Sequence, residues 1–239
     1  EILFLNYRNL EKTLNKYWPN FKVGYSYKTN SLPWLINWMK SKGAFAEVVS
    51  TPEYKLAKKI GYSPSEIIMN GPNKGNSSMK EVLDSGGVVN LDGFHEINWI
   101  EENIKDRKHP WEVGLRINID LEKVCPDETI MGKDPGRFGF SVENGDFLSA
   151  IKRLNYLKGI KVVGIHVHHS TKTKSLNVFK NLAEKSASLG SKYLEKFKPV
   201  LDRMCWKADI ELEEVIRLRL GFLMNTRYNF LFEFLFYLN

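Results

Sequence analysis

The sequence predicts an α/β fold in which parallel strands alternate with helices and close into a (β/α)8 TIM barrel. Short β-rich runs recur along the chain, and the first five begin 22, 22, 21 and 25 residues apart. That spacing fits one strand, one helix and two short connections. A leucine-rich solenoid has a similar repeat, but its LxxLxL signature is absent, so a parallel sheet covered by helices is preferred.

The β-rich runs and the composition agree with this fold. The chain has 239 residues, of which 43% are hydrophobic and 13% aromatic, which is enough for one large core and too apolar for a disordered chain. The runs are residues 23–28, 45–50, 67–70, 88–92, 113–118 and 162–168.

Helix signals lie between the runs. Ser50 and Glu53 have the spacing of a capping box, in which each side chain accepts a backbone N–H of the first turn. Leu35, Trp38 and Met39 follow a 3.6-residue period, which predicts a helix with one apolar face.

Composition and charge exclude several classes of protein. No run reaches the roughly 18 uncharged apolar residues of a membrane helix, and the first residues lack a secretory pattern, so we expect a cytoplasmic protein with no membrane partner. Cys125 and Cys205 cannot make a disulfide framework or a zinc ribbon. The net charge of +7 is spread along the chain without a nucleic-acid motif. We therefore expect no nucleic-acid partner, whereas an anionic small ligand is compatible.

Strand parity predicts the location of the site. In the first run large apolar side chains share one face, while Gly24, Ser26 and Lys28 share the other, and the fifth and sixth runs repeat this pattern. With the apolar face under the helices, polar residues point into the barrel near its C-terminal rim, where (β/α)8 enzymes keep their chemistry. These residues are Lys28, Asn90, Asp92, Arg116, Asn118, His166 and His168.

Lys28 is the candidate nucleophile. A lysine in a crowded interior loses solvation, so its pKa falls towards the range in which the free amine condenses with an aldehyde. The alternative is a lysine that snorkels from a strand end into water.

An ordered series of motifs then resembles a known family. Residues 25–30, YSYKTN, resemble the Y-x-x-K-x-N signature of the fold-type III pyridoxal phosphate (PLP) decarboxylases. The similarity is greatest to the diaminopimelate decarboxylase branch, with ornithine and arginine decarboxylases and alanine racemase as relatives. Later motifs follow in the family's order. Residues 47–53 resemble the family's D-V-V-S-x-x-E, residues 71–74 resemble G-P-x-K, and residues 90–96 resemble N-x-D-S-x-x-E. Residues 115–118 match L-R-I-N, residues 136–139 resemble K-F-G, and residues 164–171 resemble G-x-H-x-H-x-G-S.

The resemblance implies a cofactor, PLP, and a role for each matching residue. Lys28 would hold the cofactor as an imine, and His168 would stack on the pyridine ring. Glu47, where the family has Asp, would support the ring. Arg116 would face its phenolic oxygen. Thr171 would contact the phosphate. No metal site is implied.

Several of these residues also have structural explanations. His166 and His168 could be core histidines. Arg116 could be the ion-pair partner of Glu47 or Asp92, and Asp92 could cap the following helix.

The family pattern ends after Thr171. A Gly-rich phosphate loop, an E-P-G-R element and a C-terminal β-domain are expected there, and the sequence matches none of them. We therefore expect residues 1–200 to form an incomplete PLP-binding barrel and residues 201–239 to be an atypical C-terminal segment. Intact members of the family are expected to be homodimers.

The leading hypothesis is PLP-dependent decarboxylation of an amino acid, with diaminopimelate preferred and a place in lysine biosynthesis. Ornithine, arginine, a carboxyspermidine-like precursor or a D-configured centre stay open as substrates. A second hypothesis is a degenerate homologue that binds the cofactor or a partner and regulates. A third takes His166, His168 and His169 as metal ligands of a barrel hydrolase.

Overall fold

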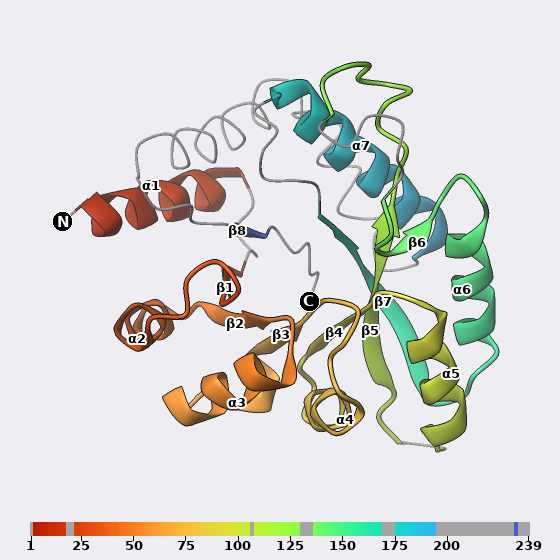
Figure 1. Cartoon of the computed structure of the whole chain (residues 1–239), viewed down its shortest axis with the longest axis horizontal. Coiled ribbons are helices and arrows are strands. Elements are labelled where there is room, and N and C mark those ends of the chain that lie inside the picture. Colours follow the sequence, from red (N-terminus) through yellow and green to blue (C-terminus); the bar gives the residue numbers. More distant parts are fainter. Residues whose placement is uncertain are drawn as a thin grey trace.

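The chain forms one curved sheet with helices around its outside (Figure 1). The structure is a computed structural model that describes residues 2–17, 22–105, 108–129, 136–168, 175–194 and 232–233. The helices are α1 (Ile2–Tyr17), α2 (Pro33–Ser41), α3 (Thr51–Ile60), the short η1 (Pro64–Glu66), α4 (Asn76–Asp84), α5 (Phe94–Asn103), α6 (Asp146–Asn155) and α7 (Leu176–Tyr193). The strands are β1 (Gly24–Ser26), β2 (Phe45–Val48), β3 (Ile67–Met69), β4 (Val88–Leu91), β5 (Trp111–Asn118), β6 (Phe140–Ser141), β7 (Ile160–Val167) and β8 (Phe232–Glu233).

The sheet topology confirms the predicted α/β fold. Strands β1 to β5 pair in sequence order and in parallel, and both β6 and β7 pair in parallel with β5. Each of the six predicted runs overlaps a strand, and β5 and β7 begin two residues before their predicted runs. The sequence pattern does not predict β6, because two residues are too few to show alternation.

Within the described residues the barrel is incomplete, as predicted. Strand β7 pairs with β5 alone, and β1 pairs with β2 and with the two residues of β8. The β8 pairing is antiparallel, whereas a (β/α)8 barrel closes with parallel strands. Apart from β8, the segment 201–239 lies outside the described residues, so its boundary stays a prediction.

Apolar side chains pack the helices against the outer face of the sheet. Of the three residues that the 3.6-residue period predicts on the apolar face of α2, Leu35 and Met39 are buried, and Trp38 is partly buried against the same core. Ile36 is buried as well. Val113 and Leu115 of β5 are fully buried in the same core. Burial of each such side chain contributes about 1.5–3 kcal/mol relative to exposure, so the helices hold the sheet in its curved form.

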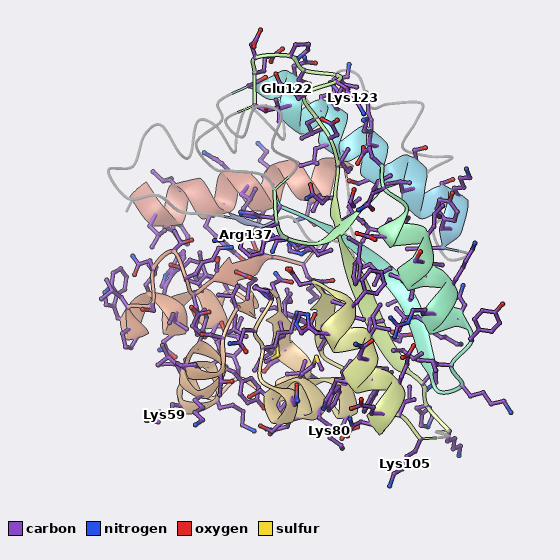
Figure 2. The ribbon with its side chains drawn as sticks, turned by 45° about the vertical axis from the view of Figure 1, so that its right-hand side comes forward. Lys59, Lys80, Lys105, Glu122, Lys123 and Arg137 are labelled. Atoms are coloured by element: carbon purple, nitrogen blue, oxygen red, sulfur yellow. The ribbon has the colours of Figure 1, made fainter. Side chains whose placement is uncertain are left out.

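Charged side chains occupy the outer surface of the helices. Lys59 on α3 and Lys80 on α4 point away from the sheet (Figure 2). Lys80 forms an exposed ion pair with Asp84 one turn later, and such pairs contribute only about 0.3–0.5 kcal/mol. No helix in the described ranges is both long enough and apolar enough to cross a membrane.

The start of α3 confirms the predicted N-terminal cap. Ser50 is the N-cap residue, and its side chain accepts the N–H of Glu53 at 3.5 Å. The Glu53 carboxylate accepts the N–H of Val49 at 2.7 Å, one residue before the position of an ideal capping box. The helix ends at Gly61, whose φ of +94° favours glycine. Capping therefore explains Glu53 as a structural residue.

Removal of this cap tests the local analysis. Ser50→Ala is expected to lower the free energy of unfolding by about 1 kcal/mol, because an N–H of the first turn loses its acceptor. The matched control is Ser149→Ala, at an exposed position of α6, with an expected change below about 0.5 kcal/mol. Urea denaturation followed by circular dichroism measures both, and equal stabilities of the two variants would contradict the assigned cap.

Candidate active site

Strand register brings the predicted polar residues together on the inner face of the sheet. Ser26 on β1 lies opposite Glu47 on β2, and Arg116 on β5 lies opposite His166 on β7. Residues opposite each other on parallel neighbouring strands point to the same face. Four strands therefore direct these side chains into the partial barrel, as strand parity predicts.

Three buried side chains form a hydrogen-bonded row across this inner face. Asn90 Nδ2 donates to Asn70 Oδ1 at 2.7 Å, and Asn70 Nδ2 donates to Glu47 Oε1 at 2.9 Å. Buried polar groups without such partners would be strongly unfavourable. Gly114 provides the necessary space, since a Cβ there would lie 2.0 Å from Asn90 Oδ1. The row fixes Glu47 in a polar but water-poor environment.

Arg116 is held at the carboxyl-terminal edge by a carboxylate and an aromatic ring. Its NH1 donates to Asp92 Oδ2 at 2.7 Å, and the other Asp92 oxygen accepts the Gly139 N–H at 3.2 Å. The guanidinium carbon lies 4.9 Å from the centre of the Phe138 ring. The ion-pair interpretation of Arg116 is confirmed. The interpretation of Asp92 as a helix cap is wrong, because α5 has Gly93 as its N-cap and its cap has no side-chain hydrogen bond.

Lys28 lies in the turn after β1, and its side chain is exposed. The prediction of a dry interior around Lys28 is therefore wrong, because β1 ends at Ser26, two residues before Lys28, and the strand no longer directs this side chain into the barrel. The turn itself is held by the motif residues. Tyr25 Oη donates to the carbonyl oxygen of Asn30 at 3.1 Å, and the Thr29 N–H donates to the carbonyl oxygen of Ser26 at 3.4 Å. The conformation that presents Lys28 at the edge is thus defined.

The two histidines differ in their environment. His166 on β7 is 1% exposed, whereas His168, directly after β7, is half-buried. The two histidines are two residues apart along an extended chain, so their side chains point to the same face of the sheet. His168 lies nearer the carboxyl-terminal edge of the sheet. Thr171 lies outside the described residues, so its phosphate contact stays a prediction.

Sequence reasoning does not identify Asn70 or the buried ion pair of Lys74 and Glu96. Lys74 Nζ lies 2.7 Å from Glu96 Oε1 and 2.5 Å from the carbonyl oxygen of Gly71. Burial lowers the pKa of Lys74, and the Glu96 carboxylate opposes this shift. Both residues belong to motifs recognised in the sequence, G-P-x-K and N-x-D-S-x-x-E. The presence of one charged residue in each of these two motifs is the sequence signal that could reveal the ion pair.

The residues present fit a flat, anionic ligand that carries an aldehyde, as PLP does. Ser26 Oγ is fully buried, and no hydrogen-bond partner for it lies in the described part of the chain. Gly139 has φ of +80°, and a Cβ there would lie 2.8 Å from the Arg116 carbonyl oxygen, so the backbone comes close to the site. The donor set comprises the Lys28 amine for an aldehyde, the His168 ring for stacking and the Arg116 guanidinium for an anionic oxygen.

Comparison with known proteins defines the family. A model of the family described as "Pyridoxal-dependent decarboxylase, pyridoxal binding domain" matches residues 6–196. This match covers most of the chain, and the chain therefore belongs to this family. The described sheet and helices are the partial barrel of its pyridoxal-binding domain.

Two similar proteins from Bacillus species are both named diaminopimelate decarboxylase. Diaminopimelate decarboxylase of Bacillus subtilis (strain 168) is 29% identical over 148 residues, which are 62% of this chain and 34% of that protein. The Bacillus methanolicus enzyme of the same name is 24% identical over 204 residues, 85% of this chain and 46% of that protein.

Solved structures of diaminopimelate decarboxylases share the fold. The enzyme from M. jannaschii has a TM-score of 0.70 at 24% identity and is matched over 79% of this chain and 44% of its own. The Helicobacter pylori enzyme complexed with L-lysine has a TM-score of 0.66 at 18% identity, over 94% of this chain and 59% of its own. At these identities the structures show the fold alone. The chain spans less than half the length of the curated relatives it matches.

Substitution of Gly114 tests the inner polar row. Gly114→Ala is expected to lower the free energy of unfolding by about 1–3 kcal/mol, because the new methyl group would displace the Asn90 side chain. In an Asn90→Ala background the same substitution should cost less, since the clashing atom is gone. Urea denaturation of the four proteins in this cycle gives the coupling, and an identical cost of Gly114→Ala in both backgrounds would show that Asn90 does not occupy this space.

Proposed function

We propose that this chain is the cofactor-binding part of a PLP-dependent amino acid decarboxylase and that Lys28 holds the cofactor covalently. The observation that carries the proposal is that an amine, a guanidinium and an imidazole lie at or near the carboxyl ends of three parallel strands of one sheet. Lys28 follows β1, Arg116 lies two residues before the end of β5, and His168 follows β7. Because the three strands are parallel, their carboxyl ends meet at the position where barrel enzymes bind substrate.

Each residue at this edge would have a distinct role towards PLP. The exposed Lys28 amine is accessible to an aldehyde carbon, and Arg116 would face the phenolic oxygen of the ring. His168 would cover one face of the ring, while Glu47 on the inner face would provide polar support. Thr171 would contact the phosphate. The positive charge of Lys28 and Arg116 also favours an anionic ligand at this edge.

The chemistry divides between the cofactor and the chain. PLP, when bound, supplies an electron sink for the pair released as the carboxylate leaves the α-carbon of the substrate. Lys28 Nζ must lose its proton before it can attack an aldehyde carbon, and the turn fixed by Tyr25 keeps it at the edge. Arg116, held by Asp92, keeps a positive charge in one position. The buried row that contains Glu47 excludes water from the inner side.

The substrate and assembly belong to the same proposal. Diaminopimelate is the preferred substrate because the matched relatives carry that name, which places the protein in lysine biosynthesis. We propose a cytoplasmic homodimer. Since the chain spans less than half of its curated relatives, we assign the decarboxylation to the protein as a whole, with residues 1–200 as the PLP-binding region and 201–239 as a separate segment.

Two other hypotheses make different predictions. A degenerate homologue would bind PLP without releasing carbon dioxide. A barrel hydrolase would use His166, His168 and His169 on a metal ion. The parts of the chain that the structure describes contain no cluster of three or more metal-binding side chains, and His169 lies outside them. Nothing in the described geometry therefore favours the hydrolase.

Covalent trapping tests the function of Lys28. PLP added to the purified chain is expected to give a visible absorbance band, and borohydride reduction followed by peptide mapping should place the adduct on Lys28. In Lys28→Ala the amount of reduced adduct is expected to fall at least about a hundredfold, because Lys28 is the amine assigned to the cofactor aldehyde. Lys22→Ala, an exposed lysine just before β1, is the matched control and should be labelled like the parent chain.

The outcomes separate the hypotheses. An adduct on Lys28 together with carbon dioxide release from diaminopimelate supports the decarboxylase. An adduct without carbon dioxide release supports the degenerate homologue, provided that the protein tested also contains the C-terminal part found in other members of the family. A folded chain in which Lys28 is unmodified contradicts both.

A further inference from the structure

A buried chain of charged contacts leads from the loop after β3 to Arg116. Lys74 is 2% exposed, and its Nζ contacts the carboxylate of Glu96 on α5 at 2.7 Å. The other oxygen of Glu96 accepts the backbone N–H of Asp92 at 2.6 Å. Asp92 in turn holds Arg116 at 2.7 Å. Every residue in this chain of contacts therefore touches the next.

The contacts tie together the loops that surround the candidate site. Lys74 also donates to the carbonyl oxygen of Gly71 at 2.5 Å, and its own carbonyl oxygen accepts the Thr51 hydroxyl at 3.1 Å. Asp92 accepts the N–H of Gly139, 47 residues further along the chain, at 3.2 Å. The ends of β2, β3, β4 and β5 are thus joined at the carboxyl-terminal edge of the sheet.

The charges form one electrostatic cluster. Burial lowers the pKa of Lys74, the carboxylates of Glu96 and Asp92 oppose this shift, and the positive charge of Arg116 adds to it. Two cations and two carboxylates therefore alternate at close range. An ion pair of this kind is not needed for stability, because well-packed apolar residues often replace buried pairs without loss. Its specific contribution is the orientation that its hydrogen bonds impose.

We propose that Lys74 and Glu96 are positioning residues that fix Arg116 for the cofactor through Asp92. This inference rests on the proposed function, because it concerns the arginine assigned to the phenolic oxygen of PLP. Neither residue touches the cofactor. Glu96 holds the Asp92 backbone in place, Lys74 holds Glu96, and the Asp92 side chain is then directed at both Arg116 and the Gly139 amide.

Two double variants separate positioning from stability. Lys74→Met/Glu96→Leu removes both charges and the acceptor for the Asp92 N–H. Lys74→Met/Glu96→Gln removes the same charges but keeps an oxygen that can accept this N–H. Both have similar volume and avoid an unpaired buried charge. The Leu variant leaves the Asp92 N–H without this acceptor, so urea denaturation should show a lower midpoint for it, and the two are compared below the onset of unfolding of either. The comparison between them isolates the bond to Asp92.

The expected result is a difference in cofactor binding between the two variants. Titration of the visible PLP absorbance should give a dissociation constant about tenfold higher for the Leu variant than for the Gln variant, because Arg116 is no longer fixed. Hydrogen exchange at the Gly139 amide, measured without PLP, should be about tenfold faster in the Leu variant. If the Leu variant does not fold, Glu96→Asp replaces it, with the same expectation, since it keeps the charge beside Lys74 and shortens the reach to Asp92.

The failures can be told apart. A parent chain that binds no PLP overturns the proposed function, and this inference with it, before any variant is compared. A parent chain that binds PLP, with equal affinities and equal Gly139 exchange in the two variants, overturns the inference alone.

Discussion

Polar side chains buried on the inner face of this sheet need hydrogen-bond partners other than bulk water, and this constraint organises the structure. The strands are buried under helices on one face, and the other face carries Glu47, Asn70 and Asn90 in a continuous hydrogen-bonded row. A buried donor or acceptor left unsatisfied costs about 1–3 kcal/mol, so the row and the strand register that aligns it depend on each other. Gly114 is part of the same requirement, because any larger residue would fill the space of the Asn90 amide.

The same requirement places positive charge at the carboxyl-terminal edge. Arg116 is partly buried, and Asp92 pairs with its guanidinium at 2.7 Å; Asp92 in turn keeps its position because Glu96 holds its backbone N–H. Lys28 at the same edge is exposed and lies in the turn after β1, whose conformation is held by Tyr25 and Thr29. A fixed arginine and an accessible amine at the same edge of the sheet would suit the proposed cofactor, whose bond to the lysine must exchange with the substrate amine while the ring stays in place.

Much of the fold follows from sequence, whereas the site is only partly predictable. Periodicity predicts the strands and α2, and parity predicts that Arg116 and His166 share the inner face, since both are local properties of the chain. The exposure of Lys28 depends on where β1 ends, at Ser26, and the end of a strand is set by pairing with its neighbours, which is not local. The ion pair of Asp92 with Arg116 is one of two pairings that the sequence suggests for this arginine, whereas the bond of Asp92 to the Gly139 amide, 47 residues away, and the hold of Glu96 on the Asp92 N–H are not predictable from local pattern.

A crystal structure of the chain grown with PLP tests the central claim most directly. We predict continuous electron density from Lys28 Nζ to the cofactor, with the ring between His168 and the inner face and the Arg116–Asp92 ion pair intact. Cofactor density at any other place on the protein, or a Lys28 side chain without attached density in a crystal that contains bound PLP, would contradict it.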